Sequence, residues 1–177
     1  MKTRNHNMLF EGLVFNIEQL EAEIGAKGFH TFQIIRHPGG AGVLPVHDDG
    51  SVTLIRQLRP AVGTELLEIP AGRFSPQEPP LECARRELLE ETGIQAEEFH
   101  PLGVVHSSPG VFDEVIHIYA ATGLTHGAAS PEADEEIELV RISPTEAMTM
   151  AADGRISDAK TLAALLRWEL TCRMKST

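Results

Sequence analysis

The stretch that most constrains the fold is residues 72–94, GRFSPQEPPLECARRELLEETGI. Proline is tolerated in a helix only in its first turn, so Pro79 and Pro80 mark a helix start. Glycine just past a helix end adopts the left-handed conformation without strain, so Gly93 marks the stop. The spacing predicts about three turns of helix between them. Because the strand-like run ELLEIPAG, residues 65–72, leads straight into this stretch, the local structure is predicted as strand, turn and helix.

Two kinds of side chain recur on this helix with helical spacing. The apolar positions form the predicted buried stripe: Leu81, Ala84 and Leu88. Glu87, Glu90 and Glu91 fall at i, i+3 and i+4, so they crowd another face, where like charges repel one another. A divalent cation removes that repulsion. The crowding therefore indicates a metal site, although charged runs are also common on helices that face only solvent.

Written with U for a bulky apolar residue, the stretch is G-x5-E-x7-R-E-U-x-E-E-x-G-U, and every defined position is filled. This pattern resembles the signature of the Nudix hydrolases, with Leu88 and Ile94 in the apolar positions. The resemblance extends from about Gly40 to the end of the chain. It implies the Nudix fold, an α/β (α+β) domain in which a mixed sheet lies between helices, and it implies hydrolysis of a diphosphate.

The resemblance also implies a set of metal ligands. Glu87 and Glu91 are the principal ones, the backbone carbonyl of Ala71 is another, and Glu90 is a frequent further ligand. Glu90 has the alternative of a solvated neighbour that only adds negative charge. Oxygen ligands beside substrate phosphates suit Mg²⁺, with Mn²⁺ as the alternative.

Four further positions of the pattern have expected roles. Arg86 is expected to orient a glutamate through a charge-assisted pair and is counted with the catalytic residues, as is Glu90. Glu78 is expected to tie the loop back to the helix. Gly72 lets the backbone turn close to metal and phosphate, and Gly93 ends the helix.

Two stretches outside the helix point to a substrate. Residues 54–72, LIRQLRPAVGTELLEIPAG, resemble the ADP-ribose pyrophosphatases, and the turn of Ser108, Pro109 and Gly110 lies where that subgroup carries its marker proline. The resemblance implies hydrolysis of ADP-ribose to AMP and ribose 5-phosphate. The alternatives are another nucleoside diphosphate sugar, such as GDP-mannose, or a sensor that binds ADP-ribose or a nucleotide without turnover. Sensors typically lose a motif glutamate, and this chain keeps all three.

Substrate contacts are predicted from the same stretches. Arg56 and Arg59 would meet diphosphate or ribose, unless they are an exposed pair on an edge strand. Glu68 and Glu114 would accept hydrogen bonds from sugar or base, unless they cap turns. Pro109 and Gly110 complete the predicted substrate-binding set.

The catalytic base is expected in the acidic loop predicted over LTHGAASPEADE, residues 124–135, before the last strand. Members of the subgroup place a glutamate there as base or as a further metal ligand. Counting back from Ile137, Glu135 takes this position, and it is the expected base and metal ligand. Glu132 and Asp134 remain alternatives.

Composition narrows the class of protein. At 177 residues the chain holds one well-packed domain and a small extension. A net charge of −11 without a basic patch argues against a nucleic-acid partner, and neither a membrane span nor a signal peptide is visible. Cys83 and Cys172 are expected to be buried free thiols, which is typical of a reducing cytoplasm.

The chain is predicted to divide into residues 1–38, a β-strand extension, and residues 39–177, the hydrolase domain. Within 8–36, two apolar strands are expected on either side of a polar interruption. Exposed strands of this kind associate unless they are covered. The resemblance implies that they pair with a second subunit in a homodimer; the alternative is that they fold back on their own sheet.

Two further elements are predicted in the hydrolase domain. The segments GVLPV and SVTLIRQLR, on either side of the turn at 47–50, are expected to form a hairpin. A final helix is expected to start at Ser157 or Asp158, with one buried face made of Leu162, Leu165, Leu166 and Leu170.

Overall fold

The computed structural model describes residues 1–130 and 136–175. The chain forms two compact units. The smaller contains residues 1–39 and 106–115, and the larger contains residues 40–105 and 116–177. None of the helices in the described part of the chain is long and apolar enough to cross a membrane.

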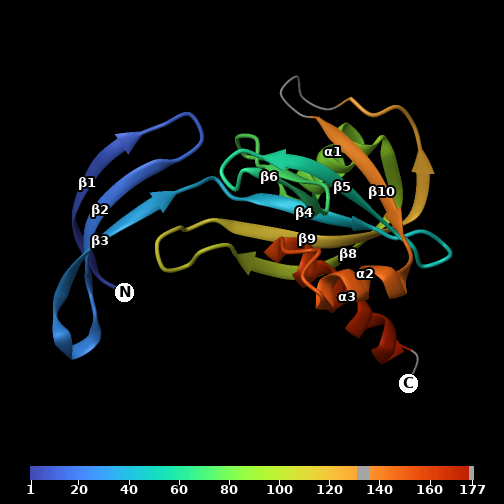
Figure 1. Ribbon diagram of the computed structural model, residues 1–177. Helices are drawn as coiled ribbons and strands as arrows, with labels where there is room; N and C mark the ends of the chain where they lie inside the picture. Colours follow the sequence, from blue (N-terminus) through green and yellow to red (C-terminus); the bar gives the residue numbers. More distant parts are fainter. Residues whose placement is uncertain (131–135, 176–177) are drawn as a thin grey trace. The chain divides into compact units, whose positions relative to one another are not determined.

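The smaller unit is built on an antiparallel sheet in the order β1-β2-β3 (Figure 1). Its elements are β1 (Thr3–Glu11), β2 (Asn16–Glu23), the 3₁₀ helix η1 (Gly25–Lys27) and β3 (Phe29–Arg36). The polar interruption expected between two strands is therefore wrong, because Asn16–Glu23 is itself the central strand. Leu20 and Ala22 alternate inward and are buried, while Glu18 and Glu21 pair with arginines on the neighbouring strands.

The segment 106–115 belongs to this smaller unit, which the sequence did not indicate. Ile35 N donates to Val111 O at 2.8 Å, and Asp113 N donates to Ile35 O at 3.1 Å. Arg36 Nη1 also lies 2.9 Å from Asp113 Oδ2. The turn that carries the marker proline is therefore held by the end of β3. A role of residues 1–38 in dimerisation stays a prediction.

The described strands of the larger unit form two sheets (Figure 1). One has the order β7-β4-β9-β8, made of Ala71–Arg73, Gly40–Pro45, Val115–His126 and Ile94–His106. It is mixed, since β4 runs parallel to β9 and antiparallel to β7. The other is antiparallel in the order β10-β5-β6, made of Ile137–Ile142, Val52–Arg59 and Thr64–Glu68. Strand β9 extends through His126, into the segment expected to be irregular.

The predicted hairpin of β4 and β5 is wrong, because only the bridge between Val46 and Val52 joins these segments. All of β4 and most of β5 are buried. A strand covered on both faces suits the middle of a sheet, and each of the two takes a central place in its own sheet.

Helices pack on both sides of β4, as the predicted mixed α+β class requires. They are α1 (Pro80–Thr92), α2 (Pro144–Ala152) and α3 (Ala159–Lys175). Ala41 and Val43 of β4 pack with Ala84 and Leu88 of α1. Leu44 belongs to the other core cluster, with residues of α2 and α3. The predicted fold class is confirmed.

Caps and burial fix how α2 and α3 sit. Ser143 caps α2 as expected, since its hydroxyl accepts from Glu146 N. Asp158 accepts from Thr161 N at 2.9 Å and so caps α3. The predicted buried face of α3 is wrong in part, because Leu166 and Leu170 are about half exposed. Leu165 is buried as predicted, and Thr161 and Ala164 are buried as well, because Thr161 Oγ1 accepts from Ile69 N at 2.8 Å and fixes the rotation of the helix.

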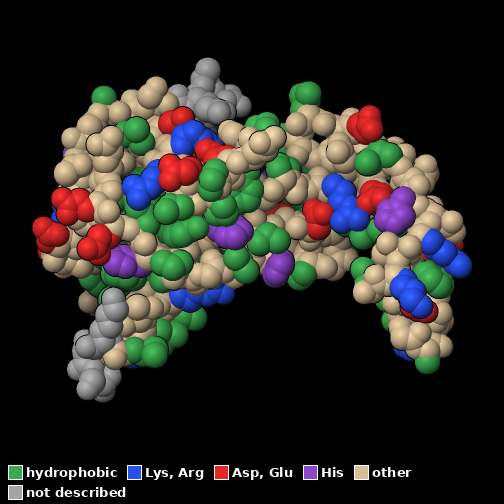
Figure 2. Space-filling view, turned by 180° about the vertical axis from the view of Figure 1, so that it is seen from behind, with side chains coloured by type: hydrophobic (Ala, Val, Ile, Leu, Met, Phe, Trp, Pro, Cys, Tyr) green, Lys and Arg blue, Asp and Glu red, His purple; other side chains and the backbone are tan. Residues whose placement is uncertain are grey.

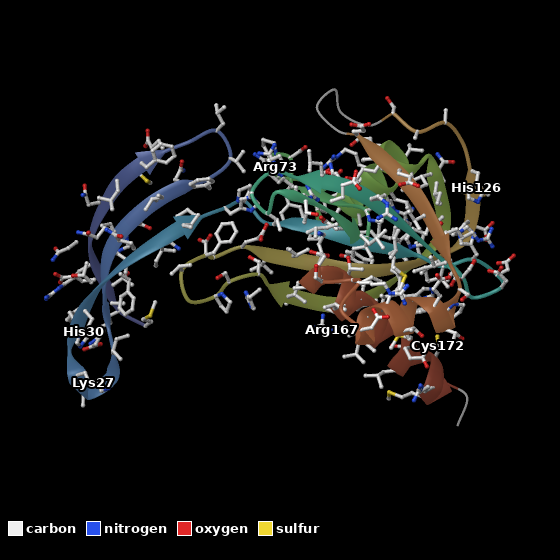
Figure 3. All side chains as sticks on the ribbon, in the orientation of Figure 1. Lys27, His30, Arg73, His126, Arg167 and Cys172 are labelled. Atoms are coloured by element: carbon white, nitrogen blue, oxygen red, sulfur yellow. The ribbon has the colours of Figure 1, made fainter. Side chains whose placement is uncertain are left out.

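Neither cysteine is in a disulfide. Cys83, a residue of α1, is buried, and burial raises the pKa of its thiol to about 12. Cys172, expected to be buried, is only half-buried near the end of α3 (Figure 3).

Candidate active site

The predicted strand, turn and helix are present. Strand β7 leads through a turn to α1, whose N-cap is Pro79. Gly93 ends the helix in the left-handed region, with φ of 69° and its N–H donating to Leu89 O at 2.8 Å. A β-carbon on Gly93 would also lie 2.6 Å from Gly127 O, so two independent constraints require glycine there.

The Glu87 carboxylate lies against the backbone of β7. A β-carbon on Gly72 would lie 1.9 Å from Glu87 Oε1, closer than any real contact allows. Only glycine leaves room for this carboxylate, which is why the turn needs Gly72. Gly72 was predicted to allow a close approach of the backbone. In the structure, the group that the backbone approaches at Gly72 is the carboxylate of Glu87, on the helix.

Glu91 is anchored to the same strand. Its Oε2 accepts from Ala71 N at 3.0 Å, and the residue is only 2% exposed. The expected separation of a glutamate face from a buried face is therefore wrong: Glu87 and Glu91 are buried, while Leu81 is only half-buried. The helix can bury these carboxylates because backbone N–H groups and Arg86 satisfy them.

Arg86 is the centre of this cluster. Its Nη1 donates to Glu87 Oε1 at 2.7 Å and to Glu90 Oε2 at 2.9 Å. Its Nε and Nη2 donate to the two oxygens of Glu78, at 2.8 and 2.9 Å. The hydrogen bond to Glu78, together with the other carboxylates, raises the pKa of Arg86. The ion pair expected between Arg86 and a motif glutamate is present.

Glu78 ties the turn to the helix in the way its position suggested. Besides Arg86, it accepts from Ser75 N at 2.9 Å. The hydrogen bond from Arg86 holds the pKa of Glu78 at about 2, against a smaller opposing effect of burial. Arg73, labelled on this turn in Figure 3, contributes its carbonyl oxygen to Arg86 Nη2 at 3.0 Å.

The cluster has an excess of acid. Arg86 pairs with three carboxylates, those of Glu78, Glu87 and Glu90, and a fourth, Glu91, accepts from Ala71 N on the adjoining strand. Carboxylate and carbonyl oxygens are the ligands of hard divalent cations. Within residues 1–130 and 136–175, no three His, Cys, Asp or Glu side chains converge closely enough to hold a metal by themselves. Arg86 already pairs with Glu87 and Glu90. A cation would therefore need backbone oxygen and water as ligands in addition to the carboxylates of Glu87 and Glu91. The donor set fits such an ion.

The predicted substrate arginines lie on β5, the middle strand of its sheet, which excludes the edge-strand alternative. Arg56 Nε donates to Glu138 Oε2 at 2.9 Å. Arg59 donates through Nε and Nη2 to the two oxygens of Glu68, both at 2.8 Å. On the face shown in Figure 2, several acidic and basic side chains lie next to one another.

Glu68 is only 1% exposed, and both Arg59 and Lys160 bind its oxygens. This burial corrects the expectation that Glu68 accepts hydrogen bonds from sugar or base. Lys160 was missed by sequence reasoning, because a lone lysine near a helix start carries no distinguishing pattern.

The other predicted substrate residues belong to the smaller unit. Ser108 O accepts from Val111 N and Phe112 N at 3.1 and 2.9 Å, which closes the turn that contains Pro109 and Gly110. Glu114 Oε1 lies 3.4 Å from His37 Nδ1.

The expected catalytic base, Glu135, and its alternatives Glu132 and Asp134 lie outside the described residues. The chain that leads to them is attached to the end of α1. Gly127 N donates to Gly93 O at 2.7 Å, and Ser130 N donates to Glu90 O at 2.9 Å.

Comparison with known proteins identifies the class. The model of the NUDIX domain family matches residues 36–165, and the chain therefore belongs to the Nudix family. A crystal structure of an ADP compounds hydrolase superposes with a TM-score of 0.84 at 22% identity, covering 98% of this chain and 95% of that one, which shows the shared fold.

Three relatives narrow the class further. The ADP-ribose pyrophosphatase of Bacillus subtilis is 31% identical, over 93% of this chain and 90% of its own length. The methanol dehydrogenase activator of Bacillus methanolicus is 32% identical, over 98% of this chain and 95% of its own length. The GDP-mannose pyrophosphatase of Yersinia enterocolitica is 37% identical, over 84% of this chain and 93% of its own length. The protein is a Nudix pyrophosphohydrolase related to ADP-ribose and GDP-mannose pyrophosphatases, in a family that generally uses divalent metal ions.

Proposed function

We propose that this protein hydrolyses ADP-ribose to AMP and ribose 5-phosphate with Mg²⁺. The observation that carries the proposal is the acid cluster between β7 and α1, where Gly72 and Ala71 seat the carboxylates of Glu87 and Glu91. The chain that holds this cluster aligns over 93% of its length with a protein named ADP-ribose pyrophosphatase.

The residues of the cluster have different roles in this proposal. Glu87, Glu91 and the carbonyl of Ala71 hold the metal, and Glu90 adds a further carboxylate. Arg86 orients Glu87 and Glu90 through its Nη1. When bound, Mg²⁺ neutralises charge on the diphosphate and makes a water molecule more acidic. Mn²⁺ suits the same oxygen ligands.

The reaction needs a base and an anion-binding group. The oxygen of a water molecule attacks one phosphorus, and the bond from that phosphorus to the bridging oxygen breaks, which leaves one phosphate on each product. Glu135 accepts the proton of the water. Arg59 and Arg56 meet the diphosphate, and Pro109, Gly110 and Glu114 meet the sugar or base.

The role of Glu135 is tested by Glu135→Gln, with Glu132→Gln as the matched control. Removing a base slows the chemical step, so Glu135→Gln should lower kcat more than it changes KM, whereas Glu132→Gln should not. Steady-state kinetics on the two variants checks this. The reverse result would move the base to Glu132.

GDP-mannose is the second candidate substrate, because a relative named GDP-mannose pyrophosphatase is 37% identical. A panel of nucleoside diphosphate sugars with Mg²⁺ or Mn²⁺, assayed for released AMP or GMP, separates the candidates. ADP-ribose should be cleaved fastest. Release of GMP alone would favour GDP-mannose, and binding of ADP-ribose without turnover of any member would favour a sensor.

We also propose that the protein is a homodimer whose interface includes the sheet of the smaller unit. All of β1 is exposed, and the apolar side chains exposed on this sheet and its first turn include Leu9, Phe10, Leu13, Val14, Phe15 and Phe32. Apolar strands of this kind associate in water. Light scattering at micromolar concentration should give twice the chain mass, and a monomeric mass would contradict the proposal.

A further inference from the structure

Lys160, in the first turn of α3, is a buried cation that the chemistry above does not use. Its side chain is 11% exposed and forms ion pairs with Glu68 and, at 3.1 Å, with Asp158 Oδ1. Lysine is almost never buried unless it is paired. The pairing with Glu68 joins the end of β6 to a helix 92 residues further along the chain.

Glu68 is the acceptor that Lys160 and Arg59 share. Its Oε2 accepts from Arg59 Nη2 and also from Lys160 Nζ, while its Oε1 accepts from Arg59 Nε. Burial by itself raises the pKa of this carboxyl, but the hydrogen bond from Arg59 and the charge of Lys160 outweigh it and hold the pKa at about 2. One buried carboxylate is thus fixed from two sides.

The neighbouring backbone holds the same arrangement rigid. Thr161 Oγ1 accepts from Ile69 N at 2.8 Å and donates to Asp158 Oδ2 at 2.6 Å. The residue after Glu68 in the chain and the residue after Lys160 are therefore hydrogen-bonded to each other. The start of α3 cannot shift without moving the carboxylate.

Arg59 presents free donors at the other end of this arrangement. Its two hydrogen bonds to Glu68 are donated by Nε and Nη2. Nη1 takes no part in these hydrogen bonds. The Arg59 side chain is 36% exposed, and its pKa is raised mainly by the hydrogen bond to Glu68 and to a smaller extent by the charge of Glu91. A guanidinium fixed on one edge, with donors left on the other, matches the geometry of a phosphate.

We propose that Lys160 is a positioning residue, which holds the Glu68 carboxylate in place so that Arg59 presents Nη1 to the diphosphate of the substrate. The inference rests on the proposed function, since it needs a diphosphate substrate beside Glu91. Without Lys160, Glu68 Oε2 loses a donor, and the Arg59 guanidinium turns further toward Glu68 to replace it. The start of α3 thereby becomes part of the machinery that binds substrate.

A double-mutant cycle tests this on the full chain, with Lys160→Met, Arg59→Ala and the pair. Lys160→Met should raise KM for ADP-ribose by about tenfold or more with a smaller change in kcat, because ground-state binding is what it weakens. In the Arg59→Ala background the same change should have almost no further effect on KM. Lys160→Arg should recover most of the affinity, and Lys27→Met, at an exposed lysine in η1 (Figure 3), is the control.

Equal KM effects of Lys160→Met with and without Arg59 would overturn the proposal, as would a lowered melting temperature with unchanged KM. If Lys160→Met does not fold, Lys160→Gln keeps a donor without the charge and is put through the same cycle. Failure of wild-type protein to cleave ADP-ribose would instead count against the proposed function. The cycle is then measured on whichever diphosphate sugar of the panel is cleaved, because the diphosphate is common to all.

Discussion

Two clusters of charged side chains differ in their balance of acid and base. Beside α1, Arg86 pairs with three carboxylates, and a fourth, Glu91, accepts from the backbone of β7. Where β5 and β6 meet the start of α3, Arg59 and Lys160 alternate with Glu68 and Asp158, two cations with two carboxylates. The first cluster is short of positive charge and suits a divalent cation. The second is balanced within itself and leaves a guanidinium edge for an anion. A metal–diphosphate substrate needs both.

The buried carboxylates of the two clusters have different hydrogen-bond donors. Glu68 and Glu91 are almost equally buried. Glu68 accepts hydrogen bonds from the charged side chains of Arg59 and Lys160, whereas Glu91 accepts one from the neutral N–H of Ala71. Arg59 and Lys160 therefore compensate the charge of Glu68.

The largest expected effect follows from removing charge in the first cluster. Glu91→Gln should lower kcat at least about a hundredfold at saturating Mg²⁺, the scale of losing a group that meets transition-state charge. The fold should survive, because glutamine can still offer an oxygen to Ala71 N. Kinetics with a melting curve checks both, and Glu82→Gln, on the exposed side of the same helix, is the matched control. Near-normal kcat in a folded Glu91→Gln protein would remove the basis for calling this cluster a metal site.

A smaller effect is expected from filling the space at Gly72. In Gly72→Ala the new methyl group must displace the Glu87 carboxylate, because their predicted separation is only 1.9 Å. Displacing a metal ligand should weaken divalent-cation affinity by about tenfold to a hundredfold. Calorimetric titration with Mn²⁺ measures it. Gly127→Ala, where the nearest atom is 3.4 Å away, should bind as wild type; equal affinities of all three proteins would show that Glu87 is no ligand.

The second cluster should make the free energy of unfolding depend on pH. The folded-state pKa of Glu68 is about 2 against an ordinary 4.5. Because its pKa is lower in the folded state, the ionised Glu68 carboxylate stabilises the fold. This contribution is fully present above pH 4.5 and is lost as pH falls through about 2. The loss is on the order of 3 kcal/mol. Unfolding free energies from pH 6 to pH 2 should therefore fall more steeply in wild type than in Glu68→Gln, and parallel curves would exclude this role of the ion pairs.

The local structure of the motif follows from the types and spacing of its residues. Pro79 and Gly93 act through their own backbone geometry, so the helix start and stop followed directly from residue type. Ser143 likewise caps the helix that follows it. The fixed spacing from Gly72 to Ile94 was enough to indicate the family, the fold class and a cluster of acid.

Which charges meet and which faces are buried depends on contacts between segments that are distant in the chain. The strand Asn16–Glu23 looks polar alone and is held by arginines on neighbouring strands. The rotation of α3 is set by Thr161 bonding to Ile69, and the partner of Glu68 is a lysine 92 residues away. Helical spacing placed Glu87 and Glu91 on one face but not inside the protein. Their burial depends on Gly72, Ala71 and Arg86, because a buried carboxylate is tolerated only where other parts of the fold supply its donors.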